Sequence, residues 1–209
     1  MAVAHPVRPY DVKRERRDLY TGTVGRFALV DVPRLQYLQV DGHGDPNTSP
    51  DYRDAVSALY AAAYAVRAAA RAALGRVHVV GPLEGLWSAK DLRVFRTRDK
   101  AAWEWTLLLV QPDWITGKLV DAALDQVTRR APGVHRVRFA PYEEGRCVQV
   151  LHVGAYDDEG PLLEQLHDSW LPAHGLVPTG RHHEVYLLDP RRTAPARLRT
   201  LLRQPVGLG

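Results

Sequence analysis

Cysteine is almost absent from the sequence, because Cys147 is the only one among 209 residues. A single cysteine cannot form an intrachain disulfide, and it removes every zinc motif that is built on cysteine pairs. A reducing compartment therefore fits best, and we expect the protein to be cytoplasmic.

Long apolar runs are also lacking, including at the N-terminus, where a signal peptide would lie. The most apolar stretch, 55–74, is rich in alanine but is interrupted by Arg67 and Arg71. Such a stretch is typical of a helix in a globular protein and not of a membrane span. We expect no membrane partner.

Several functional motifs are missing as well. The chain has no G-x-G-x-x-G, no P-loop, no G-x-S-x-G and no His-x-x-x-His pair, so nucleotide-binding, serine-hydrolase and zincin functions lack support. No helix-turn-helix signature is present, and the formal net charge of +4 is spread along the chain, so we expect no nucleic-acid partner. The run His182-His183-Glu184 does not favour a metal, because adjacent residues of a strand point to opposite faces. We expect neither a metal nor another cofactor.

The composition that remains is that of an ordinary globular protein, with 45% hydrophobic and 25% charged residues. Hydrophobic periodicity and turn residues predict a strand, a helix and two strands, followed by the same series again. The first series covers 35–40, a helix capped by Ser49 and ended by Gly75, 77–89 and 103–110, with Asp99-Lys100 in the last hairpin. The second series covers 148–153, 161–174, 184–188 and 198–206. A helix over 116–130 connects them, and the first thirty residues form a loosely packed lead-in with one short helix.

The two series also resemble each other in their residues. Leu38-Gln39-Val40 lines up with Leu151-His152-Val153, and 83–87 lines up with 183–187, so that Glu84 is the counterpart of Glu184. Each half has a sheet too small to bury both faces, so the halves join edge to edge or face to face. We predict an α+β fold: one domain over 1–206, with modules over 34–112 and 136–206 and a connector over 113–135. Its antiparallel sheet carries helices on one face and a central ligand groove on the other.

Strand alternation selects the residues of this groove. Val185 and Leu187 belong against the helix, so Glu184 and Tyr186 point into the open face. A face with carboxylates, an imidazole and aromatic rings is suited to a small molecule and not to a phosphate group. The other residues expected to bind substrate there are His152, Gln39, Glu84, Tyr64, Trp87 and Trp105.

The role of each polar residue is open at this point. Glu184 is either a solvated carboxylate or one held in an aromatic pocket, where desolvation raises its pKa and makes it a base or a partner for a cation. Tyr156 either packs on the start of a helix or donates a hydrogen bond to a substrate oxygen. His152 is either structural or catalytic. The tryptophans belong to the core by default, with at least one near the groove.

Five stretches together resemble the GyrI-like small-molecule-binding family. They are 81–87, 103–106, 111–113, 145–159 and 182–206, and the resemblance extends from about Asp11 to Val206. The resemblance implies a pair of strand–helix–strand–strand (SHS2) modules around a central ligand groove, in agreement with the repeat.

The same resemblance implies a function. Stand-alone members include hydrolases that open the cyclopropane ring of DNA-alkylating natural products, in which a glutamate activates water and a tyrosine assists. Glu184 matches that glutamate, and Tyr156 is the best match for the tyrosine. Members fused to a DNA-binding domain are drug sensors for cationic aromatic ligands. The alternatives for this chain are therefore a protein that sequesters planar aromatic or cationic compounds without turnover and, more remotely, an inhibitor of another protein. The expected partner is a planar aromatic small molecule, and the expected state is a monomer or homodimer.

Overall fold

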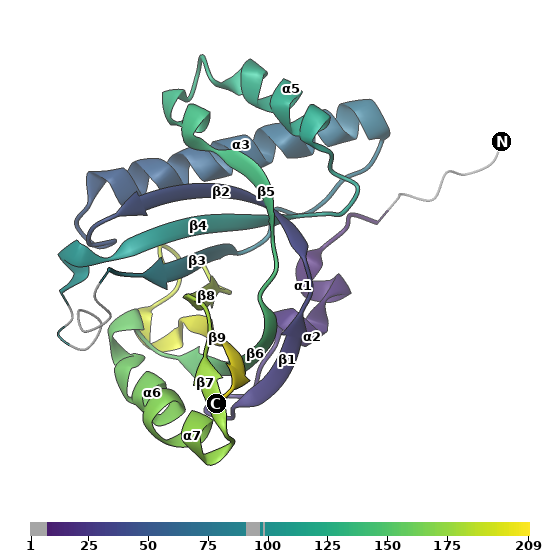
Figure 1. The fold of residues 1–209 in the computed structure, drawn as a ribbon. Helices are drawn as coiled ribbons and strands as arrows, with labels where there is room; N and C mark the ends of the chain where they lie inside the picture. Colours follow the sequence, from purple (N-terminus) through teal and green to yellow (C-terminus); the bar gives the residue numbers. More distant parts are fainter. Residues whose placement is uncertain (1–7, 91–96, 98) are drawn as a thin grey trace.

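The computed structural model describes residues 8–90, 97 and 99–209 (Figure 1). Within these residues, nine strands form one antiparallel sheet in the order β1-β6-β9-β8-β3-β4-β2-β5, with β7 paired to β9. The strands are β1 (Ala28–Val32), β2 (Leu35–His43), β3 (Leu83–Ser88), β4 (Glu104–Gln111), β5 (Arg138–Tyr142), β6 (Gly145–Val153), β7 (Leu176–Pro178), β8 (His182–Tyr186) and β9 (Arg199–Leu208). The α-helices are α1 (Val12–Glu15), α2 (Arg17–Tyr20), α3 (Pro50–Leu74), α5 (Gly117–Val127), α6 (Gly160–Gln165) and α7 (Leu171–Ala173). Shorter turns of helix are η1 (Lys100–Ala102), η2 (Pro132–Arg136), η3 (Tyr156–Asp158), η4 (Leu166–Trp170) and η5 (Pro195–Arg197).

The predicted repeat and fold class are confirmed. The series β2-α3-β3-β4 is followed by β6-α6-β8-β9, and the two halves join edge to edge through the antiparallel pair β3–β8. The strand order is therefore symmetric about this central pair, with β4 and β2 on one side and β9 and β6 on the other.

The strands that precede each half are exchanged between the halves. β1 runs into β2 but pairs with β6, whereas β5 runs into β6 but pairs with β2. The register is continuous across both junctions, since Val32 pairs with Gly145 and the next paired residues are Leu35 and Tyr142. The chain thus forms one long antiparallel ribbon that bends between the two halves.

Helix α3 has the ends that the sequence predicts. The Ser49 hydroxyl accepts a hydrogen bond from the Tyr52 backbone N–H, Pro50 occupies the first turn, and Gly75 closes the helix in the left-handed region with φ 62°. Its apolar stripe, including Leu59 and Val66, is fully buried against β2 and β4. This packing fixes the first turn of α3 above the sheet.

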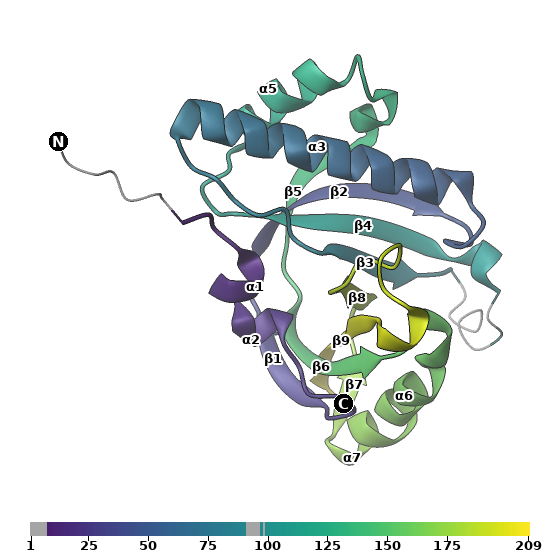
Figure 2. The same cartoon turned by 180° about the vertical axis from the view of Figure 1, so that it is seen from behind.

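Two groups of helices lie on the same face of the sheet (Figures 1 and 2). The first, α3 and α5, packs on side chains such as Leu38 and Leu107 of the first half. The second, η4 and α7, packs on Val148 and Val206 of the second half. The middle strands β3 and β8 lie between the two groups.

The opposite face is not open, which corrects the expectation of a groove there. The N-terminal helices α1 and α2 cover it, and their side chains Val12, Leu19 and Tyr20 are at most 3% exposed. They pack with Leu86 and Val185 of the middle strands. The lead-in segment is therefore part of the core, because the curved sheet leaves an apolar interior that has to be filled.

The remaining differences concern the limits of elements. The predicted strand over 77–89 is shortened to β3, and the predicted helix over 161–174 is broken into α6, the π-helical turn η4 and α7. The sequence patterns did not indicate β1, β5 or β7. Lys100 lies in η1, and residues 91–96 and 98 of the predicted hairpin lie outside the described residues.

A buried ionic network joins the two halves inside the sheet. Arg203 Nη1 donates to Glu144 Oε2 at 2.9 Å, and His183 Nδ1 lies 2.9 Å from the same oxygen. On its other side, His183 Nε2 is 3.0 Å from Glu84 Oε2, and Tyr20 donates to Glu84 Oε1 at 2.7 Å. The side chains of Arg203, Glu144, His183 and Glu84 are at most 1% exposed.

The same network anchors the N-terminal segment. Arg203 Nη2 donates to the Leu19 carbonyl at 2.7 Å, and its Nε donates to Gln149 Oε1 at 2.9 Å. The Gln149 amide then donates to the Thr21 carbonyl at 2.9 Å. These bonds join the segment 19–21 to β6 and β9 of the second half, and the Tyr20–Glu84 bond joins it to β3 of the first half.

The charges in the network stabilise one another. Burial alone would lower the pKa of His183, but the negative charge of Glu144 and hydrogen bonds to Glu144 and Glu84 raise it to about 9. Burial would raise the pKa of Glu144, but His183 and Arg203 lower it to about 2. Both groups are therefore charged at neutral pH.

Replacing Glu144 by glutamine will strongly destabilise the fold. Glu144→Gln leaves Arg203 and His183 buried without their shared carboxylate, which we expect to lower the free energy of unfolding by about 3–5 kcal/mol. The adjacent and exposed Glu143 is the matched control, and Glu143→Gln should change it by less than about 0.5 kcal/mol. Urea unfolding followed by circular dichroism measures both. Equal stability of the two variants would contradict the importance of the network.

The network also predicts how stability depends on pH. The pKa of His183 is raised in the folded state from an ordinary 6.5, so its contribution is fully present below pH 6.5 and is lost as the pH rises through about 9. The pKa of Glu144 is lowered from 4.5, so its contribution is present above pH 4.5 and is lost as the pH falls toward 2. Thermal unfolding from pH 3 to 10 should show both losses. Glu144→Gln should show a weaker loss on the alkaline side, and an unchanged alkaline loss would rule out His183 as its source.

Candidate functional site

Strand β8 carries a row of polar side chains on the helix-bearing face, between the two groups of helices. His182, Glu184 and Tyr186 alternate with His183 and Val185, which point to the interior. This reverses the predicted placement of Val185 against the helices. The physical reason is that α1 and α2 fill the interior, so the apolar residues of β8 face them.

Gly85 lies directly opposite Glu184 on β3. A Cβ atom at this position would stand 3.1 Å from Trp87 Nε1 and 3.2 Å from the Tyr186 hydroxyl. The missing side chain therefore lets these two polar groups approach each other beside Glu184.

Both oxygens of Glu184 face a neighbour on its own strand. Tyr186 donates to Glu184 Oε2 at 2.7 Å, and Trp87 Nε1 donates to the Tyr186 hydroxyl at 3.2 Å. His182 Nε2 lies 3.5 Å from Glu184 Oε1. The side chain of Glu184 is only 14% exposed, which favours a carboxylate held among aromatic rings over a solvated one.

Aromatic rings continue from this carboxylate toward the start of α3. Tyr52 stacks on Trp87 with ring centroids 6.4 Å apart and meets the edge of Trp105 at 5.1 Å. Trp103 contacts Trp87 at 5.5 Å. Burial and the charge of Glu184 raise the pKa of Tyr52, so its hydroxyl stays protonated. Tyr52 was not among the predicted site residues, although the cap at Ser49 fixes the first helical turn above the sheet.

Tyr156 and Glu159 border the other side of the row. The Tyr156 ring lies 5.3 Å from that of Tyr186. Burial, followed by the charges of Glu159 and Glu184, raises the pKa of Tyr156 to about 12, so it remains a hydrogen-bond donor at neutral pH.

Glu159 is a buried acid whose pKa the neighbouring Glu184 influences. It is 4% exposed, and burial together with the charge of Glu184 raises its pKa to about 10. Near pH 7 the site therefore holds Glu159 as a neutral acid. Sequence reasoning did not select Glu159 as a site residue.

Two of the predicted site residues lie on the interior face, away from Glu184. Glu84 belongs to the buried ionic network, and Gln39 donates to the Ala140 carbonyl and accepts from Arg138. Their predicted placement beside Glu184 is wrong. For Gln39 the predicted position opposite Leu38 and Val40 holds, and it lies apart from Glu184 because Glu184 itself is on the helix-bearing face. Glu84 was aligned with Glu184 one residue out of step, and a shift of one residue moves a side chain to the other face of a strand.

The remaining predicted residues are placed as follows. Trp87 and Trp105 are buried in the aromatic row described above. His152 is on the helix-bearing face, but its Nε2 is 3.1 Å from the Ala155 carbonyl, so it contacts the backbone just before η3. Tyr64 is 58% exposed and stacks on Tyr60 along α3, and no contact joins it to Glu184.

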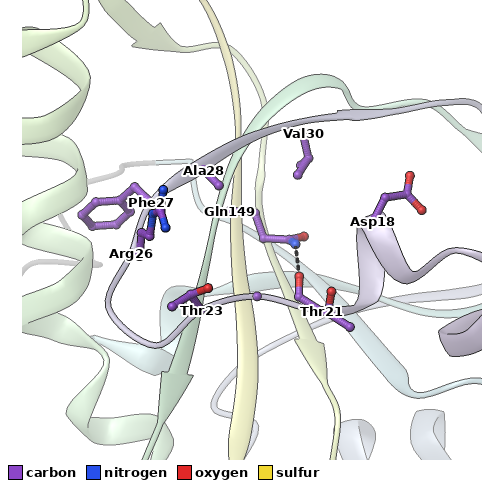
Figure 3. A pocket seen from close by; sticks show the side chains of 9 residues that line it. Asp18, Thr21, Thr23, Arg26, Phe27, Ala28, Val30 and Gln149 are labelled. Atoms are coloured by element: carbon purple, nitrogen blue, oxygen red, sulfur yellow. Dashed lines mark hydrogen bonds between the residues drawn. The ribbon is translucent and has the colours of Figure 1, made fainter.

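Two hollows in the described part of the chain do not have Glu184 in their walls, although the second reaches Trp105 of the aromatic row. One, of about 480 Å³, lies between the N-terminal segment and β1, with Asp18, Arg26, Phe27 and Gln149 in its wall (Figure 3). The other, of about 730 Å³, lies at the ends of β2, β3 and β4. It is lined by Asp41, Gly42, His43, Ser88, Lys90, Ala101, Ala102, Glu104, Trp105, Thr106 and Arg181. A central groove over Glu184 remains a prediction.

Across residues 8–90, 97 and 99–209, no group of three or more His, Cys, Asp or Glu side chains could hold a metal ion. In the same part of the chain, no helix is both long and apolar enough to cross a bilayer.

The chain belongs to the GyrI-like small molecule binding domain family, whose model matches residues 27–206. An uncharacterized conserved protein from Listeria innocua is 35% identical, with a TM-score of 0.87 over 95% of this chain and 100% of that one. Two structures described as hydrolases from Listeria innocua are 33% and 32% identical, with TM-scores of 0.82 and 0.83. They match 95% and 96% of this chain and 100% of theirs. No curated protein matches the chain.

The close approach at Gly85 can be tested by substitution. In Gly85→Ala the added methyl group presses on Trp87 Nε1 and the Tyr186 hydroxyl, and we expect it to separate them and to lower stability by about 1–3 kcal/mol. Gly117→Ala is the control, because a Cβ there meets nothing within 4 Å. Near-ultraviolet circular dichroism and thermal unfolding measure the change. An unaltered aromatic spectrum in Gly85→Ala would contradict the tight packing.

Proposed function

We propose that the protein hydrolyses the cyclopropane ring of DNA-alkylating natural products and thereby provides detoxification or self-resistance. The observation that carries this proposal is Glu184, a largely buried carboxylate between two tyrosines and a tryptophan. The relatives described as hydrolases support a hydrolytic reaction, and the family supports a small-molecule ligand.

The proposed chemistry starts from the electrophilicity of a cyclopropane conjugated to a dienone. Glu184 takes a proton from water while the water oxygen bonds to a ring carbon. The carbon–carbon bond breaks, and its electron pair passes into the dienone, which becomes an aromatic phenolate. This phenolate takes up a proton, so the product contains the substrate plus one water.

Tyr156 is the proposed donor to the oxygen on which charge develops. Its hydroxyl stays protonated at neutral pH, as a donor at this position requires. His152 is a weaker candidate, because its Nε2 already lies near the Ala155 carbonyl. Trp87, Trp105 and Tyr186 would hold a flat substrate by stacking. The reaction proposed here uses no cofactor.

The same residues also suit a second function, the binding of a compound without turnover. The site combines the Glu184 carboxylate with aromatic rings, which suits a planar cation by charge and cation–π attraction. In this alternative the protein sequesters planar aromatic or cationic compounds without turnover. We further propose a cytoplasmic monomer or homodimer that does not bind nucleic acid.

The variant Glu184→Gln distinguishes hydrolysis from sequestration. Glu184→Gln keeps the size of the side chain but cannot accept a proton as a carboxylate, so we expect turnover of a cyclopropyl dienone to fall on the order of 10²–10⁴-fold. Binding of a neutral substrate should change little. A protein that only sequesters cations should instead lose affinity for cations in this variant.

Mass spectrometry of the hydrated product and titration of tryptophan fluorescence measure these two quantities. Glu164→Gln is the matched control, because Glu164 is exposed on α6. Tight binding with no product above the buffer background in the unmodified protein would reject hydrolysis. Many turnovers per protein molecule would reject sequestration.

A further inference from the structure

His182 is a largely buried imidazole whose ring forms no hydrogen bond with the described residues. Neither of its ring nitrogens has a hydrogen-bond partner among the residues that the structure describes, although both are shielded from water. The side chain is 15% exposed and shares its strand face with Glu184. A buried imidazole with no partner is costly, which points to a state of the protein in which the partner is present.

Glu184 is the group that can become this partner. Its Oε2 is occupied by the Tyr186 hydroxyl, so Oε1 is the oxygen left for a second contact. That oxygen lies 3.5 Å from His182 Nε2. In the tautomer of His182 that carries its proton on Nδ1, Nε2 is a hydrogen-bond acceptor like the carboxylate oxygen, so the two form no hydrogen bond with each other. When Glu184 gains a proton, Oε1–H can donate to Nε2.

We propose that His182 receives the proton that Glu184 removes from water, and that it is a positioning residue for this base. This inference rests on the proposed hydrolysis. The proton leaves water for Glu184 Oε1 and passes from there to His182 Nε2, which becomes an imidazolium and restores the carboxylate. The imidazolium later returns its proton to the phenolate or to solvent. A bond that forms only as the proton moves stabilises the transition state more than the resting enzyme.

The surroundings of His182 include other titratable groups. Glu184 and Tyr186 lie on the same strand, and Tyr52 from α3 and Glu159 beyond η3 interact electrostatically with Glu184. His167 comes from the π-helical turn η4. Burial and the charge of His182 lower the pKa of His167, and the charge of Asp168 opposes them. A π-helical turn changes the direction of its side chains and often occurs at functional sites.

The test is the pH dependence of kcat for a cyclopropyl dienone, because a purely structural histidine would not affect it. Imidazole side chains change charge between pH 5 and 8, so kcat of the unmodified protein should rise across this range. In His182→Gln we expect kcat to fall on the order of 10²-fold and the rise to disappear. Imidazole added to His182→Ala should restore activity in a saturable way. His43→Gln, at an exposed position at the end of β2, is the control for loss of a histidine.

The outcomes distinguish this inference from the function on which it rests. If Glu184→Gln loses turnover but His182→Gln keeps both its kcat and its pH profile, the role of His182 is rejected and the hydrolysis stands. If unmodified protein turns over substrate with no change in kcat between pH 5 and 8, the role is rejected without any variant. Absence of ring opening in the unmodified protein rejects the proposed function itself.

Discussion

Arg203 and Glu144 meet inside the sheet with about 1% of either side chain exposed, and charges so placed are stable only when they neutralise each other. Glu144 lies at the bend of the long ribbon, and Arg203 lies on β9 of the second half. Through His183 the same contact reaches Glu84 on β3, and through the Leu19 carbonyl it reaches the N-terminal segment. The curvature of the sheet, the pairing of the halves and the position of α2 all depend on keeping these charges satisfied.

His183 of this network and Glu184 of the proposed site are neighbours on β8 that point to opposite faces. The buried network thus holds the strand that carries Glu184, since any movement of β8 would disturb His183 on one face and Glu184 on the other. The backbone in the middle of a central strand has less conformational freedom than a loop. A base carried there is therefore held more precisely in position.

The sequence was most informative where local rules decide the structure. The cap at Ser49, the glycine at 75 and the alternation of side chains along 184–186 depend on neighbouring residues, and the structure agrees with each. The face toward which each set of β8 side chains points was predicted the wrong way round, because it depends on what covers the sheet. It was least informative where distant parts of the chain compete for one surface. Nothing local indicates that Tyr20 would bond to Glu84, so the interior face appeared open and Glu84 appeared to belong to the site. Tyr52 and Glu159 were not predicted for the same reason, because their electrostatic interaction with Glu184 arises only from the way α3 and η3 are placed.

The exchange of β1 and β5 makes each half of the chain depend on the other for a complete sheet. A half that paired its leading strand within itself would leave no edge there for the other half to complete. Because each half instead completes the sheet of the other, half of this chain is an unfinished structure with an unpaired edge. Two separate copies of one half could satisfy that edge only by exchanging strands as a dimer, whereas here the two halves are parts of one chain. The halves are not equivalent at the centre of the sheet, where one carries the polar row of β8 and the other contributes Gly85 and the aromatic rings opposite it.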